Sequence, residues 1–140
     1  MSAETVHELL TRFIESEHED LSVLADDMVY TNMATGDEHR GRQGARAMLQ
    51  YIYHEAFDAH AEVRNLVCDE THAVLEATFV GRHTGEFAGV PATGKTVRVP
   101  FCVVYDMAGD KISRARIYFE IPAFLAQVRE AESTAAAVMP

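Results

Sequence analysis

Apolar residues in the first part of the chain recur at helical spacing. From Thr5 to about Glu17 they return every three or four positions, which predicts a helix with one buried face. Leu21 and Leu24 continue as a shorter second helix. A third helix is predicted from Arg42 to about Phe57. Its inner face consists of apolar side chains, which are Ala45, Met48, Leu49, Ile52 and Ala56.

One strand is predicted between the second and third helices. Residues 28–33 alternate in character, and Tyr30 and Asn32 share one face of this strand while Val29 and Thr31 share the other. The polar segment from Thr35 to Gly41 that follows predicts a turn.

The second half of the chain predicts β structure. Four apolar stretches separated by turn-forming residues are typical of strands, and they run over His60–Cys68, His72–Glu86, Thr96–Met107 and Ile112–Phe119. Because the connections between these long strands are short, an antiparallel meander is favoured. In the third of them, the alternation places one set of side chains inward, which is Val97, Val99, Phe101, Val103 and Tyr105.

The end of the chain predicts one more helix. Pro122 is suited to the first turn of a closing helix through about Ala131, because its missing N–H has no partner there in any case. Residues 133–140 are predicted to form a flexible tail. Helices gathered on one face of a curved antiparallel sheet make an α+β fold. One helical layer cannot cover a long bent sheet completely, so a pocket is expected between the two layers.

Length and charge narrow the functional classes. A chain of 140 residues is expected to form one domain, and its net charge of −10 argues against nucleic acid and against an anionic membrane surface. Neither a membrane span nor a signal peptide is expected, because the apolar runs are short and the N-terminus is polar. Cys68 and Cys102 lie in strand patterns and are interpreted as free buried thiols of a cytoplasmic protein.

The glycine-rich segment Gly81–Lys95, followed by Lys111-Ile112 and Tyr118-Phe119, carries a family resemblance. In these residues the chain resembles the SnoaL-like, or polyketide cyclase-like, branch of the nuclear-transport-factor-2-like superfamily. The resemblance implies a cone-shaped domain over residues 1–132, with N-terminal helices packed on a strongly curved mixed or antiparallel sheet and a short C-terminal helix. It also implies a pocket for a small hydrophobic molecule and a homodimer that pairs through the sheet.

Two groups within this superfamily serve as templates, the SnoaL-type cyclases and the limonene-epoxide-hydrolase-like enzymes. Tyr30 and Asn32 match the Tyr and Asn with which those hydrolases hold the attacking water. The catalytic Asp of both templates falls on Ile117. The Gln and His of the cyclases fall on Phe101 and Val103. The remaining hydrolase pair, an Arg and an Asp, falls on Thr78 and Val80 or on Arg82 and Thr84, depending on the gap.

The resemblance therefore implies an apolar pocket without the templates' acid–base groups, because isoleucine, phenylalanine and valine cannot transfer protons. The expected lining is Phe13, Tyr30, Asn32, Ile52, Thr78, Phe101, Val103 and Ile117. The remaining polar candidates for catalysis are Tyr30, Asn32, Glu76 and His83. Glu76 has two interpretations, one facing the pocket with Thr78 and the other facing outward at an oligomer contact. His83 is either catalytic or a hydrogen-bonding anchor of the glycine loop.

The other histidines give weaker indications of a functional role. His7, His18 and His39 lie in polar contexts that favour the surface, and His54 lies either at the pocket mouth or against the core. No spacing of a metal site is present, so neither a metal nor another cofactor is expected.

Three functions remain open. The first is a cyclase, isomerase or hydrolase that acts on a hydrophobic carbonyl compound. The second is a non-catalytic protein that binds such a compound, and the third is a dimeric assembly module.

Overall fold

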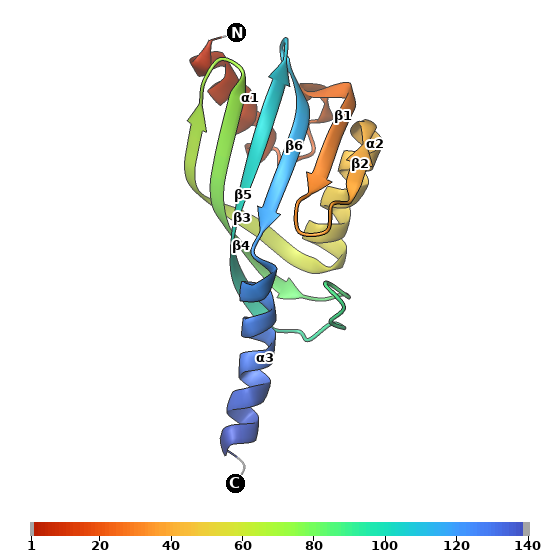
Figure 1. Cartoon of the computed structure of the whole chain (residues 1–140), viewed down its shortest axis with the longest axis vertical. Coiled ribbons are helices and arrows are strands. Elements are labelled where there is room, and N and C mark those ends of the chain that lie inside the picture. The colour runs from red at the N-terminus through yellow and green to blue at the C-terminus, as the bar shows by residue number, and fades with distance from the viewer. Residues whose placement is uncertain (1, 139–140) are drawn as a thin grey trace.

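The computed structural model describes the backbone of residues 2–138 and the side chains of residues 2–129. The helical elements are α1 (Ala3–Glu15), the 3-10 turn η1 (Leu21–Val23), α2 (Gly41–Gln50), the π-helical turn η2 (Tyr51–Glu55) and α3 (Ile121–Val138). The strands are β1 (Leu24–Asn32), β2 (Glu38–Arg40), β3 (Phe57–Cys68), β4 (His72–His83), β5 (Thr96–Ala108) and β6 (Lys111–Phe119). Figure 1 shows their arrangement.

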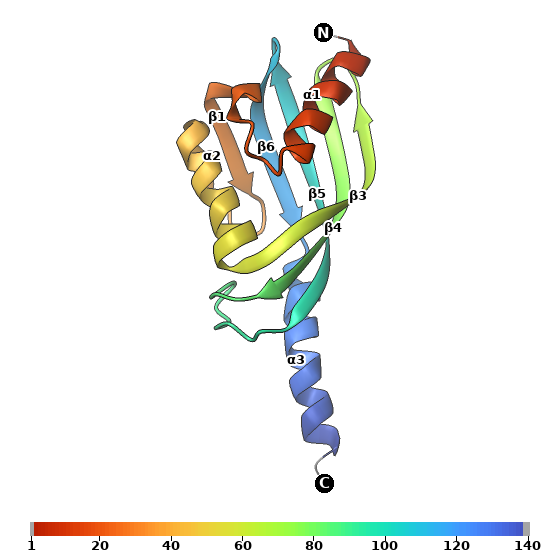
Figure 2. The same ribbon diagram turned by 180° about the vertical axis from the view of Figure 1, so that it is seen from behind.

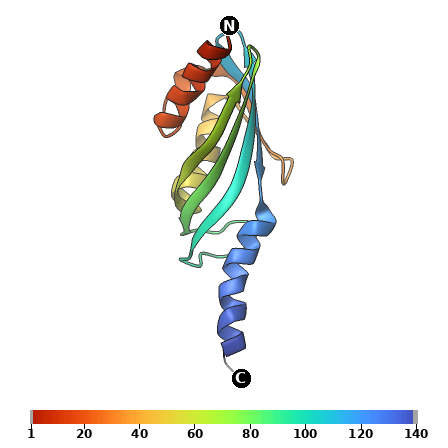
Figure 3. The same ribbon diagram turned by 90° about the vertical axis from the view of Figure 1, so that its left-hand side faces the viewer.

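The strands form one curved sheet in the order β2-β1-β6-β5-β4-β3. The expected meander of β3 to β6 is confirmed, and only the β1–β6 pair is parallel. Helices α1 and α2 lie against one face of the sheet (Figure 2), and this face is called the inner face below. In profile, the opposite or outer face carries no helix along most of its length, and α3 extends beyond one end of the sheet (Figure 3). The predicted α+β class and cone-shaped architecture are confirmed.

Alternate residues of the central strands build the core. The inward set predicted for β5 is buried, with exposed fractions of 5% or less, and its outward neighbours Arg98 and Pro100 are exposed. Six of the seven phenylalanines join in a continuous cluster of mostly edge-to-face contacts between the sheet, the glycine loop and α3. They are Phe57, Phe79, Phe87, Phe101, Phe119 and Phe124. Since each buried phenylalanine stabilises a fold by roughly 2 kcal/mol, this cluster is a major part of the hydrophobic core.

Three predicted boundaries are corrected near the N-terminal half. The second helix is only one 3-10 turn, because the Asp20 side chain caps it at the Ser22 N–H and Leu24 already pairs with β6. The α-helical part of the third helix ends at Gln50, and the chain continues as the π-helical turn η2. Strand β3 begins at Phe57, where the helix was predicted to end. The predicted polar turn over 35–41 contains β2, which pairs antiparallel with β1.

The glycine loop between β4 and β5 packs closely on η2. Strand β4 ends at His83 rather than at Glu86, because the backbone N–H groups of Thr84 and Gly85 turn to donate to the Ala56 carbonyl. A Cβ on Gly85 would lie 2.5 Å from the Glu55 carbonyl oxygen, so only glycine fits this approach. Gly89 and Gly94 have φ of +78° and +71°, the left-handed conformation that the predicted chain reversal requires.

Helix α3 begins at Ile121, with Pro122 in its first turn as predicted. Gln127 anchors it to β5 through two hydrogen bonds with the Arg98 backbone, of 2.7 and 2.6 Å. The helix runs to Val138, beyond the predicted end at about Ala131. The flexibility of residues 133–140 stays a prediction, and its last two residues lie outside the described part of the chain. Among the described residues, no helix combines the length and the hydropathy that crossing a membrane requires.

Candidate functional site

A cavity of about 250 Å³ opens on the inner face where β1 ends. It is bounded by β1, the turn into β2, β2 itself, α2, η2 and the glycine loop, and it is lined by Asn32, Asp37, His39, Ala47, Met48, Tyr51, Ile52 and Phe87. We call it the Asn32 cavity. Two of the predicted pocket residues, Asn32 and Ile52, line it.

The Oδ1 and Nδ2 ends of the Asn32 amide differ in their hydrogen bonding. Its Oδ1 accepts a hydrogen bond of 3.0 Å from the backbone N–H of Ala34, which closes the turn after β1. This contact identifies the oxygen end, because an N–H donor needs an acceptor opposite it. The Nδ2 group makes no hydrogen bond with the described residues. The amide is therefore held by the turn and can donate a hydrogen bond to a ligand in the cavity.

His39 and Asp37 bring an imidazole and a carboxylate to the same cavity. His39 pairs with Tyr30 across the β1–β2 ladder, so it lies on the inner face with Tyr30 and Asn32. Its side chain is partly buried. The Asp37 carboxylate accepts a 3.0 Å hydrogen bond from the Thr35 hydroxyl, which restrains it at the turn.

Sequence reasoning assigned His39 to the surface, and this interpretation is corrected. The missed signal is β2 itself. It has only three residues, and its burial pattern is exposed, partly buried, exposed. Recognised as a strand, this segment places His39 on the opposite face from Glu38 and Arg40.

The floor of the Asn32 cavity is apolar, and Met48, Ile52 and Phe87 are each buried. The Tyr51 hydroxyl donates to the Glu86 backbone carbonyl, which ties η2 to the glycine loop. Partial burial raises the pKa of Tyr51, with smaller contributions from Glu86 and Glu55, so its phenol stays protonated and keeps donating at neutral pH. The cavity thus combines an apolar floor with an amide, an imidazole and a carboxylate.

The other predicted catalytic candidate on β1, Tyr30, is only 3% exposed and lies in the core. Its hydroxyl pairs with that of Tyr105, and burial raises the pKa of Tyr30 well above its usual value. Tyr30 and Asn32 share a face, as predicted, but the structure brings only Asn32 to the Asn32 cavity.

Four predicted pocket residues lie within the packed interior instead. Phe13, Phe101, Val103 and Ile117 are 1–6% exposed, and none of them lines the Asn32 cavity. These side chains are packed among other apolar residues. The predicted depth of the pocket is corrected, because the phenylalanine cluster fills the interior of the cone.

Thr78 and Glu76 lie on the outer face, which corrects the expectation that Thr78 lines the pocket. Thr78 accepts a 2.8 Å hydrogen bond from Arg64 Nε, and Glu76 accepts one of 2.7 Å from the Asn65 amide. In β4 the buried, inward residues are the odd-numbered ones, which include Ala77 and Phe79. Both gap placements considered for the hydrolase pair therefore missed the inner face by one residue.

His83 anchors the glycine loop, in agreement with the second of its two interpretations. It is fully buried, and its Nδ1 accepts from the Thr93 backbone N–H at 3.3 Å and contacts the Thr93 hydroxyl at 3.0 Å. The ring proton therefore sits on Nε2, which has no hydrogen-bond partner among the described residues and is surrounded by Phe57 and Phe124. Burial lowers the pKa of His83, which keeps the ring neutral.

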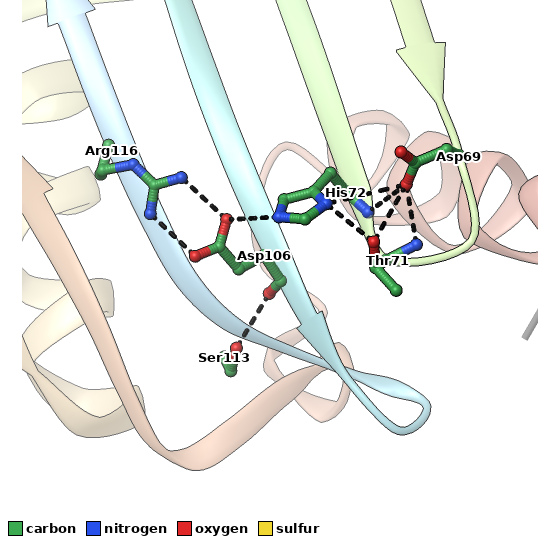
Figure 4. A network of polar contacts seen from close by, with 6 residues as sticks. All are labelled: Asp69, Thr71, His72, Asp106, Ser113 and Arg116. Atoms are coloured by element: carbon green, nitrogen blue, oxygen red, sulfur yellow. Dashed lines mark hydrogen bonds and ion pairs between the residues drawn. The ribbon is translucent and has the colours of Figure 1, made fainter.

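A polar network lies on the outer face, near the β3–β4 turn (Figure 4). Arg116 forms two hydrogen bonds with Asp106, of 2.9 and 2.8 Å, and holds the pKa of that carboxyl below its usual range. His72 lies 3.6 Å from Asp106, and its backbone N–H donates to Asp69 in the turn. This network joins β4, β5 and β6 on the face of the sheet opposite the Asn32 cavity. Within residues 2–129, no three potential metal ligands gather as a metal site.

Comparisons with known proteins agree with this architecture. The family model of the SnoaL-like polyketide cyclases matches residues 6–128, and the chain belongs to that family. A search of curated proteins found no match.

Several solved structures share the fold. A protein from Jannaschia sp. CCS1 that carries a SnoaL-like polyketide cyclase assignment is 18% identical, with a TM-score of 0.79 over 91% of this chain and 92% of that one. A SnoaL-like polyketide cyclase from Agrobacterium tumefaciens is 22% identical, with a TM-score of 0.74 over 87% and 96%. A hypothetical protein with a ketosteroid isomerase-like fold from Catenulispora acidiphila, solved with trimethylamine, is 19% identical, with a TM-score of 0.69 over 86% of this chain and 92% of that one. At these identities the likeness shows the fold.

Proposed function

We propose that this protein binds a small hydrophobic carbonyl compound in the Asn32 cavity and catalyses proton transfer on it, as a cyclase or isomerase does. The observation that carries the proposal is that Asn32, whose Nδ2 group makes no hydrogen bond with the described residues, and His39 line the same cavity above an apolar floor. A volume of about 250 Å³ suits a compound of one or two rings.

The chemistry assigns one role to each side chain. Asn32 Nδ2–H donates to the carbonyl oxygen of the ligand. His39 accepts a proton from the carbon next to that carbonyl, because an imidazole can take up a proton at neutral pH. The electron pair of the broken C–H bond forms the enolate, whose oxygen the Asn32 amide stabilises.

Two outcomes follow from this enolate. Where the enolate is conjugated with a C=C bond, the imidazolium returns its proton to the far carbon of the dienolate, which moves the double bond and isomerises the compound. Otherwise the enolate carbon attacks a second carbonyl of the same molecule in a cyclisation, and the proton passes to the new alkoxide. Asp37, held by Thr35, adds a hydrogen-bond acceptor to the same cavity.

A second candidate is non-catalytic binding of the same class of compound. It is favoured by the apolar residues at the template positions, where Ile117, Phe101 and Val103 are buried among other apolar side chains. In this case the Asn32 amide alone orients the ligand.

Deuterium exchange distinguishes the two candidates. Cyclic ketones such as cyclohexanone and 2-tetralone are incubated with the protein in D₂O, and loss of the proton signal next to the carbonyl is followed by NMR. We expect the protein to accelerate exchange, and His39→Gln to reduce this acceleration by about a hundredfold while ketone binding persists. His7→Gln, at an exposed position of α1 that lines neither this cavity nor the core, is the matched control and should exchange as the wild type does.

The results of this experiment distinguish catalysis from binding alone. Ketone binding without accelerated exchange supports the non-catalytic candidate. Exchange that survives His39→Gln removes His39 from the mechanism, and the absence of binding by every ketone contradicts both candidates.

We also propose that the protein works in the reducing cytoplasm. Cys68 and Cys102 are free thiols, and they lie on opposite faces of the sheet, where they cannot pair with each other.

A further inference from the structure

A second cavity, of about 150 Å³, lies on the other side of η2. It is lined by Ile14, Glu17, His18, Tyr53, His54, Ala59, His60 and Ala61, from the end of α1, η2 and the start of β3. We call it the His18 cavity. It shares no lining residue with the Asn32 cavity. Successive residues of η2 separate the two, because Tyr51 and Ile52 line one cavity and Tyr53 and His54 line the other.

The end of α1 positions His18 by an unusual backbone. Glu17 and His18 have φ of 56° and 64°, and neither is glycine. The His18 N–H donates to the Phe13 carbonyl at 3.1 Å, which closes the helix in the manner of a Schellman motif. Left-handed backbone at two consecutive non-glycine residues is strained, and such strain gathers at functional sites. Here it turns the His18 ring back against Tyr53 rather than into solvent.

Two polar side chains beside the cavity have unused hydrogen-bonding capacity. The His18 ring stacks on Tyr53 with centroids 5.1 Å apart, and its edge meets Phe13 at 5.0 Å. Neither the His18 ring nor the Tyr53 hydroxyl makes a hydrogen bond with the described residues. Burial lowers the pKa of His18 to about 4, so this imidazole is uncharged at neutral pH and offers one acceptor and one donor nitrogen.

The remaining wall is small and apolar. Ala59 and Ala61 lie on the inner face of β3, and their short side chains leave the space open. Ile14 closes the apolar side, and the exposed residues Glu17 and His54 form a polar rim.

We propose that the His18 cavity is a second binding site, for one uncharged aromatic ring that carries a hydroxyl or amino group, as phenols and anilines do. The volume matches this size, because an engineered cavity of about 150 Å³ binds benzene. The ring packs against the alanine methyl groups and the His18–Tyr53 pair. Its hydroxyl or amino hydrogen reaches an acceptor, either the neutral His18 nitrogen or the Glu17 carboxylate.

Charged rings fit this site less well. A carboxylate on the ring meets the Glu17 carboxylate at the rim, and like charges repel. An ammonium group is attracted by Glu17 at the rim, but an exposed ion pair of this kind contributes little. Inside the cavity the ammonium group would lose its hydration and find no open aromatic face, because His18 and Tyr53 use faces on each other.

The test uses the full chain and phenol as the probe. Histidine side-chain NMR signals are followed while phenol is added, with benzoate and benzylammonium as charged comparisons. We expect phenol to shift the His18 and His54 signals in a saturable one-to-one titration, and to leave His39 in place. Benzoate and benzylammonium should bind at least about tenfold more weakly.

Two variants fill the cavity and one serves as control. Ala59→Val and Ala61→Val suit a strand and occupy the space, and each should weaken phenol binding by about tenfold or more. Val63→Ile adds the same kind of bulk to β3 at a residue that is 48% exposed and lines neither cavity, so it should bind as the wild type does. Far-ultraviolet circular dichroism verifies that each variant folds.

Three results overturn the proposal. They are the absence of a saturable His18 shift at millimolar phenol, binding that survives both folded alanine variants, and benzylammonium binding as tight as that of phenol. A shift of His39 alone assigns the phenol to the Asn32 cavity. That result also contradicts the proposal while leaving the ketone chemistry open.

Discussion

Asn32 and Tyr30 are two positions apart on β1 and point to the same side, yet their surroundings differ. Tyr30 is buried beneath the elements that cover the inner face, and its hydroxyl lies near that of Tyr105. Asn32 lies at the end of its strand, where the turn into β2 leaves a cavity. The alternation of a strand predicts the face of a residue. The depth at which that residue lies depends on what other elements cover it.

His18 carries a prediction at this scale. Its pKa falls from 6.5 to about 4 on folding because burial disfavours the charged ring. The unfolded chain therefore binds a proton first as the pH is lowered, and stability falls between pH 6.5 and about 4. His18 accounts for a loss of up to about 3 kcal/mol over that window.

His18→Asn tests this prediction, because asparagine tolerates the left-handed backbone and does not titrate. Urea unfolding at pH 7 and pH 4.5 should show a smaller loss of stability for the variant than for the wild type. His83 and the neighbouring Glu17, Tyr53 and His54 are present in both proteins, so the difference reports on His18. An equal loss in the two proteins would contradict the burial of the uncharged ring.

At the scale of elements, η2 organises both cavities. It follows α2 without a break, and the glycine loop rests on it through the Thr84 and Gly85 N–H groups and through the Tyr51 hydroxyl. A π-helical turn shifts the side chains that follow it around the helix axis, and such turns are frequent at functional sites. Four consecutive residues of η2 are divided between the two cavities.

Gly85→Ala should disturb this arrangement. The new Cβ would lie 2.5 Å from the Glu55 carbonyl oxygen, a backbone atom that cannot move aside easily. We expect a loss of about 2 kcal/mol in the free energy of unfolding. Ketone binding should also weaken, because the loop carries Phe87 to the floor of the Asn32 cavity.

Ala92→Ser is the matched control in the same loop. Its side chain is exposed, so a change within about 0.5 kcal/mol is expected. Thermal or urea unfolding measures both variants. Equal stability of Gly85→Ala and the wild type would mean that the loop does not need its close contact with η2.

For the whole molecule, the uncovered outer face bears on assembly. The half-buried Cys102 and Val104 lie there with the exposed side chains of Val74 and Tyr118, among ion pairs such as that of Arg116 with Asp106. An outer face that mixes apolar and paired charged side chains suits a contact with a second copy of the chain. We therefore expect a homodimer through the sheet.

Light scattering at micromolar concentration should give twice the chain mass. Val74→Lys should shift the equilibrium toward the monomer, because it places a charge in the apolar part of the outer face. Gln43→Lys adds the same charge on α2, on the other side of the sheet, and should leave the dimer intact. A wild-type protein that stays monomeric would contradict this assembly.

Local periodicity in the sequence determined α1, α2, the four long strands and the inward set of β5. Spacing along the chain sets these features, because a helix or strand repeats its environment at a fixed interval. The inward facing of Ile117 was also predicted from the sequence. Its register beside Asn32 places it in the interior.

The tertiary structure alone decided which polar groups meet. β2 has too few residues to show a period, so His39 reaches the Asn32 cavity only through its pairing with β1. The unbroken pairing of β4 with β5 sets Glu76 opposite Cys102 and Thr78 opposite Pro100 on the outer face, and a register error of one residue reverses every facing in a strand. The filling of the cone by phenylalanine rings, and the two cavities that remain beside η2, depend on how distant segments pack. Packing of that kind leaves no periodic signal in the chain.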